Sequence, residues 1–207
     1  TGEMIDENRR LGVLISGRGS NLQAIIDTVA SGQLVANIVV VIANRPDAGG
    51  LVLARRAGIE TVVLMPTSYG SREEYDEALV SELRCRNVRL VCLAGVMRLL
   101  GAAFVEAFPN RVLNIHPSLL PAFPGLHGQD QAWQHGVKIA GATVHIVTSE
   151  LDAGPIVLQA AIQVRDSDTA KTLSERILIE EHRIYPEAIA IVLAGGWRID
   201  GRRFVRF

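Results

Sequence analysis

The sequence is short of the features that mark membrane, disulfide-linked and nucleic-acid-binding proteins. It has only two cysteines, Cys85 and Cys92, outside any CxxC or Cys/His metal spacing, so we expect both to be reduced packing residues. A formal net charge of -1 leaves no surplus of Lys and Arg to neutralise a phosphate backbone. No apolar run reaches the length of about 18 residues that spans a bilayer, and residues 1–10 are polar. We therefore expect a cytoplasmic protein without nucleic-acid or membrane partners.

Several common catalytic patterns are also missing. The sequence has no Gly-x-x-x-x-Gly-Lys-Ser/Thr phosphate loop and no Gly-x-Ser-x-Gly nucleophile elbow. None of its 5 histidines pairs with another at the spacing of metal ligands and with a carboxylate partner. The sequence therefore predicts no metal site.

Composition and periodicity indicate one α/β domain. Hydrophobic residues make up 48% and charged residues 21% of the 207 residues, which is typical of a globular chain of one-domain size. Apolar, β-branched runs alternate with segments of helical periodicity, which predicts a doubly wound and mainly parallel sheet. The predicted domain covers residues 1–207, with 1–10 as an N-terminal leader. Strands are predicted at 11–16, 38–43, 61–64, 88–94, 112–116, 142–147 and 156–164, with an edge hairpin at 198–207; helices are predicted at 22–29, 48–57, 71–86, 102–108, 129–135 and 169–193.

A glycine-rich loop, Gly17-Arg-Gly-Ser-Asn21, joins the first predicted strand to a helix. Backbone N–H groups and the helix dipole favour an anion at such a position, so a phosphate is the expected ligand. The alternative is a tight turn that needs glycine only for its dihedral angles. A dinucleotide site is disfavoured, because Leu22 stands where the fingerprint has its third glycine and Asn44 ends the second strand in place of an acid. Arg45, which could meet a 2′-phosphate, leaves NADP as an alternative.

Two polar residues, Asn114 and His116, stand at the end of a predicted strand, and their spacing of two sends both side chains to one face. An amide beside an imidazole at the carboxyl end of a strand is suited to stabilising an oxyanion and moving a proton. A structural role for the pair is the alternative. By spacing alone, Asp152 and Glu150 are equal candidates for a third group. The other histidines are expected to be mainly structural: His127, His135, His145 and His182.

A set of short motifs follows in order along the chain: 15–23 (ISGRGSNLQ), 71–75 (SREEY), 94–98 (AGVMR), 114–125 (NIHPSLLPAFPG), 141–145 (GATVH) and 151–155 (LDAGP). Together these segments closely resemble the phosphoribosylglycinamide formyltransferases, the folate-dependent enzymes of purine synthesis. The resemblance runs from about Leu11 to Pro186. It implies transfer of a formyl group from 10-formyltetrahydrofolate to the amine of phosphoribosyl-glycinamide on a Rossmann-like formyltransferase fold.

The resemblance also implies roles for individual residues. The implied catalytic group is Asn114, His116 and Asp152, with His116 as the proton donor and Asp152 stabilising its charged form. The implied substrate-binding residues are Gly19, Ser20 and Asn21 for the phosphate and Glu181 near the ribose. The implied folate-binding residues are Arg72, Met97, Arg98, Leu99, Leu100, Asn114, Val147, Thr148, Ser149, Glu150, Leu151 and Asp152.

Two positions depart from the family pattern. Ala122 follows Pro121 where a lysine is common, and residues 128–130 (GQD) replace a more usual small-residue or histidine pairing. We expect these departures to affect contacts of the substrate loop rather than the catalytic trio. The dense prolines of this loop make a cis peptide between Leu120 and Pro121 a hypothesis.

Other functions are alternatives to formyl transfer to the glycinamide. A formyltetrahydrofolate deformylase, which uses water in place of the amine, usually carries an added N-terminal domain, and about ten residues precede the first predicted strand here. A methionyl-tRNA formyltransferase usually has Arg-Gly-Ala where this loop reads Phe-Pro-Gly-Leu-His. A nucleotide-binding module without catalysis is the alternative from another class, and it would tolerate replacement of Asn114 and His116. The expected assembly is a monomer or a homodimer.

Overall fold

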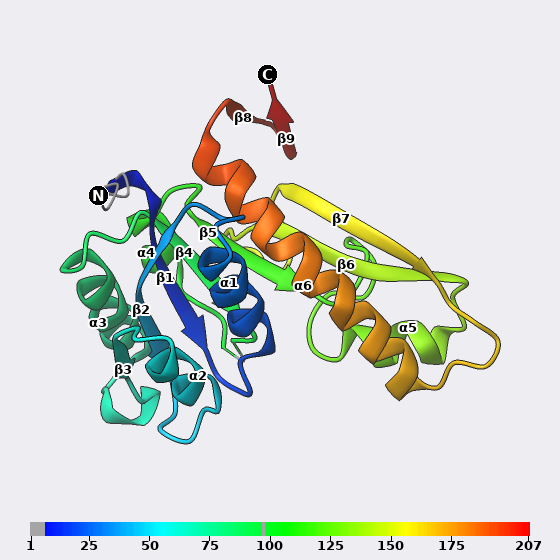
Figure 1. Cartoon of the computed structure of the whole chain (residues 1–207), viewed down its shortest axis with the longest axis horizontal. Coiled ribbons are helices and arrows are strands. Elements are labelled where there is room, and N and C mark those ends of the chain that lie inside the picture. Colours follow the sequence, from blue (N-terminus) through cyan, green and yellow to red (C-terminus); the bar gives the residue numbers. More distant parts are fainter. Residues whose placement is uncertain (1–6, 97) are drawn as a thin grey trace. The chain divides into compact units, whose positions relative to one another are not determined.

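The computed structural model describes residues 7–96 and 98–207, and strands alternate with helices along the chain as predicted (Figure 1). The strands are β1 (Arg10–Ile15), β2 (Asn37–Ala43), β3 (Thr61–Val63), β4 (Leu90–Ala94), β5 (Val112–His116), β6 (Ile139–Ile146), β7 (Ile156–Gln163), β8 (Trp197–Asp200) and β9 (Arg203–Arg206). The helices are α1 (Ser20–Ala30), α2 (Gly50–Arg56), α3 (Arg72–Arg84), α4 (Ala102–Ala107), α5 (Gly128–His135) and α6 (Ala170–Ala194). Within the described residues, no helix combines the length and the apolar character that crossing a membrane requires.

The chain divides into two compact units, Thr1–Leu113 and Asn114–Phe207, and the boundary falls inside β5. In the first unit the strand order is β3-β2-β1-β4, and all three pairs are parallel. In the second unit the order is β6-β7-β9-β8, with β7 and β9 parallel and the other two pairs antiparallel. The predicted α/β class and mainly parallel sheet are therefore confirmed, whereas the single domain stays a prediction.

Helices pack on both faces of β1. Successive side chains of a strand point to opposite faces, so Gly12 and Ile15 face different helices. On one face, a Cβ added at Gly12 would lie 2.5 Å from Leu83 Cδ2 of α3. On the other face, a Cβ added at Gly50, the first residue of α2, would lie 2.6 Å from Ile15 Cδ1. The strand is accordingly buried from its second residue to its last, which is the pattern of a doubly wound sheet.

The second unit is built around the β6–β7 pair and the long helix α6, which packs against both strands. The helix begins at a reciprocal capping box: the Thr169 hydroxyl accepts from Thr172 N, and the Thr172 side chain accepts from Thr169 N. β6 starts three residues earlier than predicted because Ile139 pairs with Gln163 of β7. Its residues from Ala140 to Ile146 are buried.

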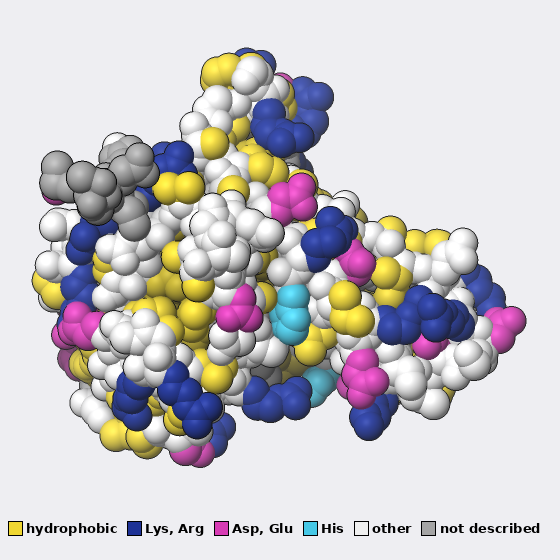
Figure 2. Space-filling view, in the orientation of Figure 1, with side chains coloured by type: hydrophobic (Ala, Val, Ile, Leu, Met, Phe, Trp, Pro, Cys, Tyr) yellow, Lys and Arg dark blue, Asp and Glu magenta, His cyan; other side chains and the backbone are white. Residues whose placement is uncertain are grey.

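The predicted C-terminal hairpin is present as the antiparallel pair β8–β9. Trp197 stacks on Phe204 across it with ring centroids 4.9 Å apart, a contact that adds to the apolar burial of a short strand pair. Arginine side chains gather on this hairpin, whereas basic and acidic side chains are interspersed on most of the face shown in Figure 2. The hairpin's arginines are Arg198, Arg202, Arg203 and Arg206.

Candidate active site

The carboxyl end of β5 places Asn114 and His116 on one face of the strand, as their spacing predicts. His116 is the last residue of the strand and is 5% exposed. Pro117 follows it and opens a proline-rich loop whose Leu120–Pro121 peptide is cis, which confirms that hypothesis. The polar pair therefore stands where the regular strand gives way to an irregular loop.

The imidazole of His116 has an oxygen beside each of its nitrogens. Nδ1 lies 3.5 Å from Oδ2 of Asp152, and Nε2 lies 2.9 Å from the carbonyl oxygen of Phe123. Neither a carbonyl nor an ionised carboxylate can donate a hydrogen bond. Nε2 therefore carries a hydrogen and donates it to Phe123 O.

Asp152 reaches His116 from the loop that follows β6. Its backbone adopts a φ of 49°, in the left-handed region that few side chains other than Asn and Asp enter. Its Oδ2 also accepts a hydrogen bond from Gly125 N at 2.8 Å, which ties the β6–β7 loop to the proline-rich loop. The side chain is 9% exposed, whereas Glu150 is exposed. Of the two carboxylates that spacing left open, the structure brings Asp152 to the histidine.

A fourth polar side chain, His145 of β6, completes this cluster, although we expected it to be mainly structural. Its Nε2 lies 3.3 Å from Nδ2 of Asn114 and 3.7 Å from Oδ1 of Asp152. Burial lowers the pKa of His145 below its ordinary value, which keeps the ring neutral. Its position next to the end of β6, just before the loop that holds Asp152, is the sequence signal that could have identified it.

The proline-rich loop is held in place by Thr143, a fully buried residue of β6 that sequence reasoning did not single out. Its hydroxyl donates to Ser118 O at 2.7 Å and accepts from Leu120 N at 3.1 Å. Gln159 of β7 donates to the same hydroxyl at 3.0 Å and to Leu120 O at 2.9 Å. These bonds satisfy buried backbone groups of the loop and fix it beside His116.

In the first unit, the glycine loop has the form expected of an anion site. Gly19 is the N-cap of α1 with a φ of 82° and has no side chain to accept from the first turn. A Cβ added there would lie 2.6 Å from Gly50 Cα, so the close approach of two backbones requires glycine. Ser20 and Asn21 begin the helix. The loop therefore presents a helix N-terminus of the kind that binds phosphate.

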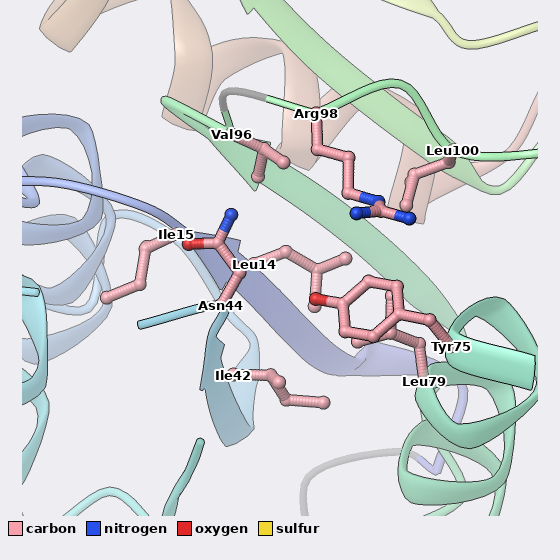
Figure 3. A pocket seen from close by; sticks show the side chains of 9 residues that line it. All are labelled: Leu14, Ile15, Ile42, Asn44, Tyr75, Leu79, Val96, Arg98 and Leu100. Carbon is pink, nitrogen blue, oxygen red and sulfur yellow. The ribbon is translucent and has the colours of Figure 1, made fainter. Parts of the chain in front are cut away.

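The residues predicted on the folate side gather between α3 and the segment after β4. Arg72, the first residue of α3, donates to Leu99 O at 2.8 Å. The Arg98 guanidinium lies 4.8 Å from the centre of the Tyr75 ring, and the two side chains point toward each other at a small pocket that Leu100 also lines (Figure 3). Met97, predicted with this group, lies outside the described residues.

The remaining predicted ligand-binding residues lie in the second unit. Val147 and Thr148 are partly buried just after β6, whereas Ser149, Glu150 and Leu151 are exposed in the loop. Glu181 is 5% exposed on the buried face of α6. Within residues 7–96 and 98–207, no group of three or more His, Cys, Asp and Glu side chains could hold a metal ion.

Residues 9–189 match the formyl transferase family. Because this match covers most of the chain, the protein belongs to that family. Among its relatives, the phosphoribosylglycinamide formyltransferase of Escherichia coli is 46% identical over 190 residues, which are 92% of this chain and 87% of that protein. The crystal structure of glycinamide ribonucleotide transformylase 1 from Symbiobacterium toebii is 54% identical with a TM-score of 0.95, over 98% of this chain and 95% of that one.

Some relatives are much longer than this chain. The human trifunctional purine biosynthetic protein adenosine-3 is 46% identical over 186 residues, which are 90% of this chain but 18% of that protein. The bovine protein of the same name is matched over 19% of its length. The chain thus spans about a fifth of these trifunctional relatives and corresponds to one part of each.

Proposed function

We propose that the chain transfers a formyl group from 10-formyltetrahydrofolate to the amine of phosphoribosyl-glycinamide, giving the N-formyl product and tetrahydrofolate. The observation that carries the proposal is the buried contact of His116 with Asp152, beside Asn114 at the end of β5. An amide donor and a charge-paired imidazole are groups that can stabilise the oxyanion of acyl transfer and move its proton. The names of the Escherichia coli and Symbiobacterium toebii relatives support the same reaction.

In the proposed reaction the glycinamide nitrogen attacks the formyl carbon, and the formyl oxygen becomes an oxyanion. An N–H of Asn114 and the protonated ring of His116 stabilise that oxyanion. The bond between the formyl carbon and the folate nitrogen then breaks, and the proton lost by the amine reaches that nitrogen through His116 or a water molecule. We assign no metal ion to this step, since the two side chains supply the positive charge and the hydrogen bonds.

The geometry of His116 favours this role. Its Nε2 donates to Phe123 O, so the ring already points a proton at an oxygen acceptor. We assign the oxyanion as the acceptor that replaces this carbonyl during turnover. Asp152 at Nδ1 supplies the negative charge that stabilises the imidazolium.

Substrate binding is assigned to the remaining predicted residues. The phosphate is assigned to the backbone N–H groups at Gly19, Ser20 and Asn21, where the dipole of α1 favours an anion. Glu181 is assigned to the ribose, whose hydroxyl groups can donate to a carboxylate. The folate is assigned to a larger set that combines apolar walls with backbone groups: Arg72, Met97, Arg98, Leu99, Leu100, Asn114 and residues 147–152. We further propose a cytoplasmic monomer or homodimer without nucleic-acid or membrane partners.

The test follows release of tetrahydrofolate from 10-formyltetrahydrofolate with and without phosphoribosyl-glycinamide. Release that depends on the glycinamide is the expected result. Release into water alone would identify a deformylase and overturn the proposal, and absence of release in both cases would favour a nucleotide-binding module. A His116→Ala protein serves as the control, because it removes the proton donor and should abolish release.

A further inference from the structure

The proton on His145 determines which way the Asn114 amide faces. His145 is a residue of β6 whose side chain is 3% exposed. Its Nδ1 lies 3.2 Å from the carbonyl oxygen of Ile146, and its Nε2 lies 3.3 Å from Nδ2 of Asn114. Each ring nitrogen can either donate or accept, so the partners decide where the hydrogen sits.

The carbonyl of Ile146 can only accept, so Nδ1 of His145 carries a hydrogen. Burial disfavours a second proton, which leaves Nε2 with a free electron pair. The neighbour that can donate to this electron pair is the Asn114 amide nitrogen, while Asp152 Oδ1 at 3.7 Å offers only electron pairs of its own. The Asp152 carboxylate therefore remains available to His116.

We propose that His145 is a positioning residue: as the neutral Nδ1–H tautomer it accepts a hydrogen bond from Asn114 and holds that amide with its nitrogen inward. The inference rests on the proposed function, in which Asn114 supplies an N–H to the oxyanion. One N–H of the Asn114 nitrogen is bonded to His145, and the second is left for the substrate. A proton on Nε2 would instead favour the flipped amide, with its carbonyl oxygen toward the ring.

The first test observes the tautomer directly and does not depend on activity. Protein labelled with ¹⁵N-histidine is examined at neutral pH by two-bond ¹H–¹⁵N correlation, and the His145 ring is assigned by the signals that vanish in His145→Gln. The expected result is a neutral ring with hydrogen on Nδ1. Hydrogen on Nε2, or on both nitrogens, overturns the inference whether or not the protein transfers formyl groups.

The second test separates positioning from packing. His145→Phe keeps a flat ring but removes the acceptor, whereas His145→Gln offers an amide oxygen in its place. We expect His145→Phe to lower kcat about 10- to 100-fold with KM nearly unchanged, as loss of an interaction specific to the transition state requires. His145→Gln should recover most of that loss. An equal loss of kcat in both variants would show that His145 contributes through packing alone, and it would overturn the positioning role.

A double mutant and a control complete this test. Because His145 is proposed to act through Asn114, His145→Phe should add little to the loss already caused by Asn114→Ala. Full additivity of the two losses would contradict the inference. Val144→Ala, which truncates a fully buried neighbour on the other face of β6, should lower the thermal midpoint without changing kcat.

Discussion

The Nδ1 atom of His116 lies 3.5 Å from Oδ2 of Asp152, and the two side chains are buried to 6% and 9% exposure. They come from different segments: His116 is the last residue of β5, and Asp152 lies in the loop after β6. The carboxylate is held at this distance by Gly125 N, which donates to the same oxygen at 2.8 Å. A buried imidazole beside a fixed carboxylate is an arrangement suited to moving a proton.

Replacing Asp152 by Asn should remove this charge with little change of shape. The amide oxygen can still accept from Gly125 N, and Asn tolerates the φ of 49°. The imidazolium of His116 then loses its counter-charge, so we expect kcat to fall about 100- to 10,000-fold in a protein of unchanged thermal midpoint. Asp166→Asn, at a side chain that is 96% exposed, is the matched control and should keep the parent rate. A fully active Asp152→Asn enzyme would remove Asp152 from the catalytic group.

Asn114→Ala should remove one oxyanion donor. Loss of such a donor costs about 100- to 1,000-fold in kcat, or about 2.7–4 kcal/mol of transition-state stabilisation. Steady-state kinetics with both substrates saturating measure this loss, and KM for the glycinamide should change little. Asn110→Gly is a suitable control, because Asn110 is exposed and its φ of 55° suits glycine. Parent-level turnover by Asn114→Ala would show that the amide is not an oxyanion donor.

Gly19→Ala tests the assigned phosphate loop. The added methyl would lie 2.6 Å from Gly50 Cα, so the loop must shift. We expect KM for phosphoribosyl-glycinamide to rise at least about tenfold, since the N–H groups at the start of α1 lose their alignment, while KM for the folate stays unchanged. Gly32→Ala is a close control: its φ of 78° carries similar backbone strain, but the added methyl meets nothing within 4 Å. If both variants change KM equally, backbone strain rather than phosphate binding is the cause.

Thr143→Val should destabilise the second unit through the proline-rich loop. Valine matches threonine in shape but leaves the Ser118 carbonyl and the Leu120 N–H without their buried partner. Each buried group left unsatisfied costs about 1–3 kcal/mol, so urea unfolding should show a loss of at least about 1 kcal/mol. Thr28→Val, whose hydroxyl donates to the Ala24 carbonyl one helical turn away, should cost clearly less. Equal costs would argue against a special role for Thr143.

Stability should fall as the pH drops below about 6.5, the ordinary pKa of histidine. Burial lowers the folded-state pKa of His145 and of His182, so the unfolded chain binds more protons than the folded chain in this window. The free energy of unfolding therefore rises with pH there and is lost on acidification. Urea titrations from about pH 7.5 to about pH 5.5 measure this slope. His145→Gln should flatten it, whereas His127→Gln, at a side chain that is 69% exposed, should leave it unchanged.

Much of the fold could be predicted because its signals are local. β5 was predicted with the bounds that it has, since an apolar β-branched run ends at a histidine followed by proline. The start of β6 was predicted too late, because Ile139 joins the strand through its pairing with Gln163 of β7. The spacing of apolar residues within a short segment indicates whether it forms a helix or a strand. Pairing between strands, in contrast, depends on segments far apart in the chain.

The sequence by itself determined the α/β class, the glycine loop at the start of α1, and the presence of Asn114 and His116 on one face of a strand end. Spacing left Asp152 and Glu150 open, and the family resemblance implied Asp152; the tertiary structure shows that Asp152 meets His116. Only the tertiary structure placed His145 and Thr143 beside them. The reason is physical. Spacing dictates the direction of side chains within one element, whereas burial and hydrogen bonds between elements decide which polar groups meet, and where their protons lie.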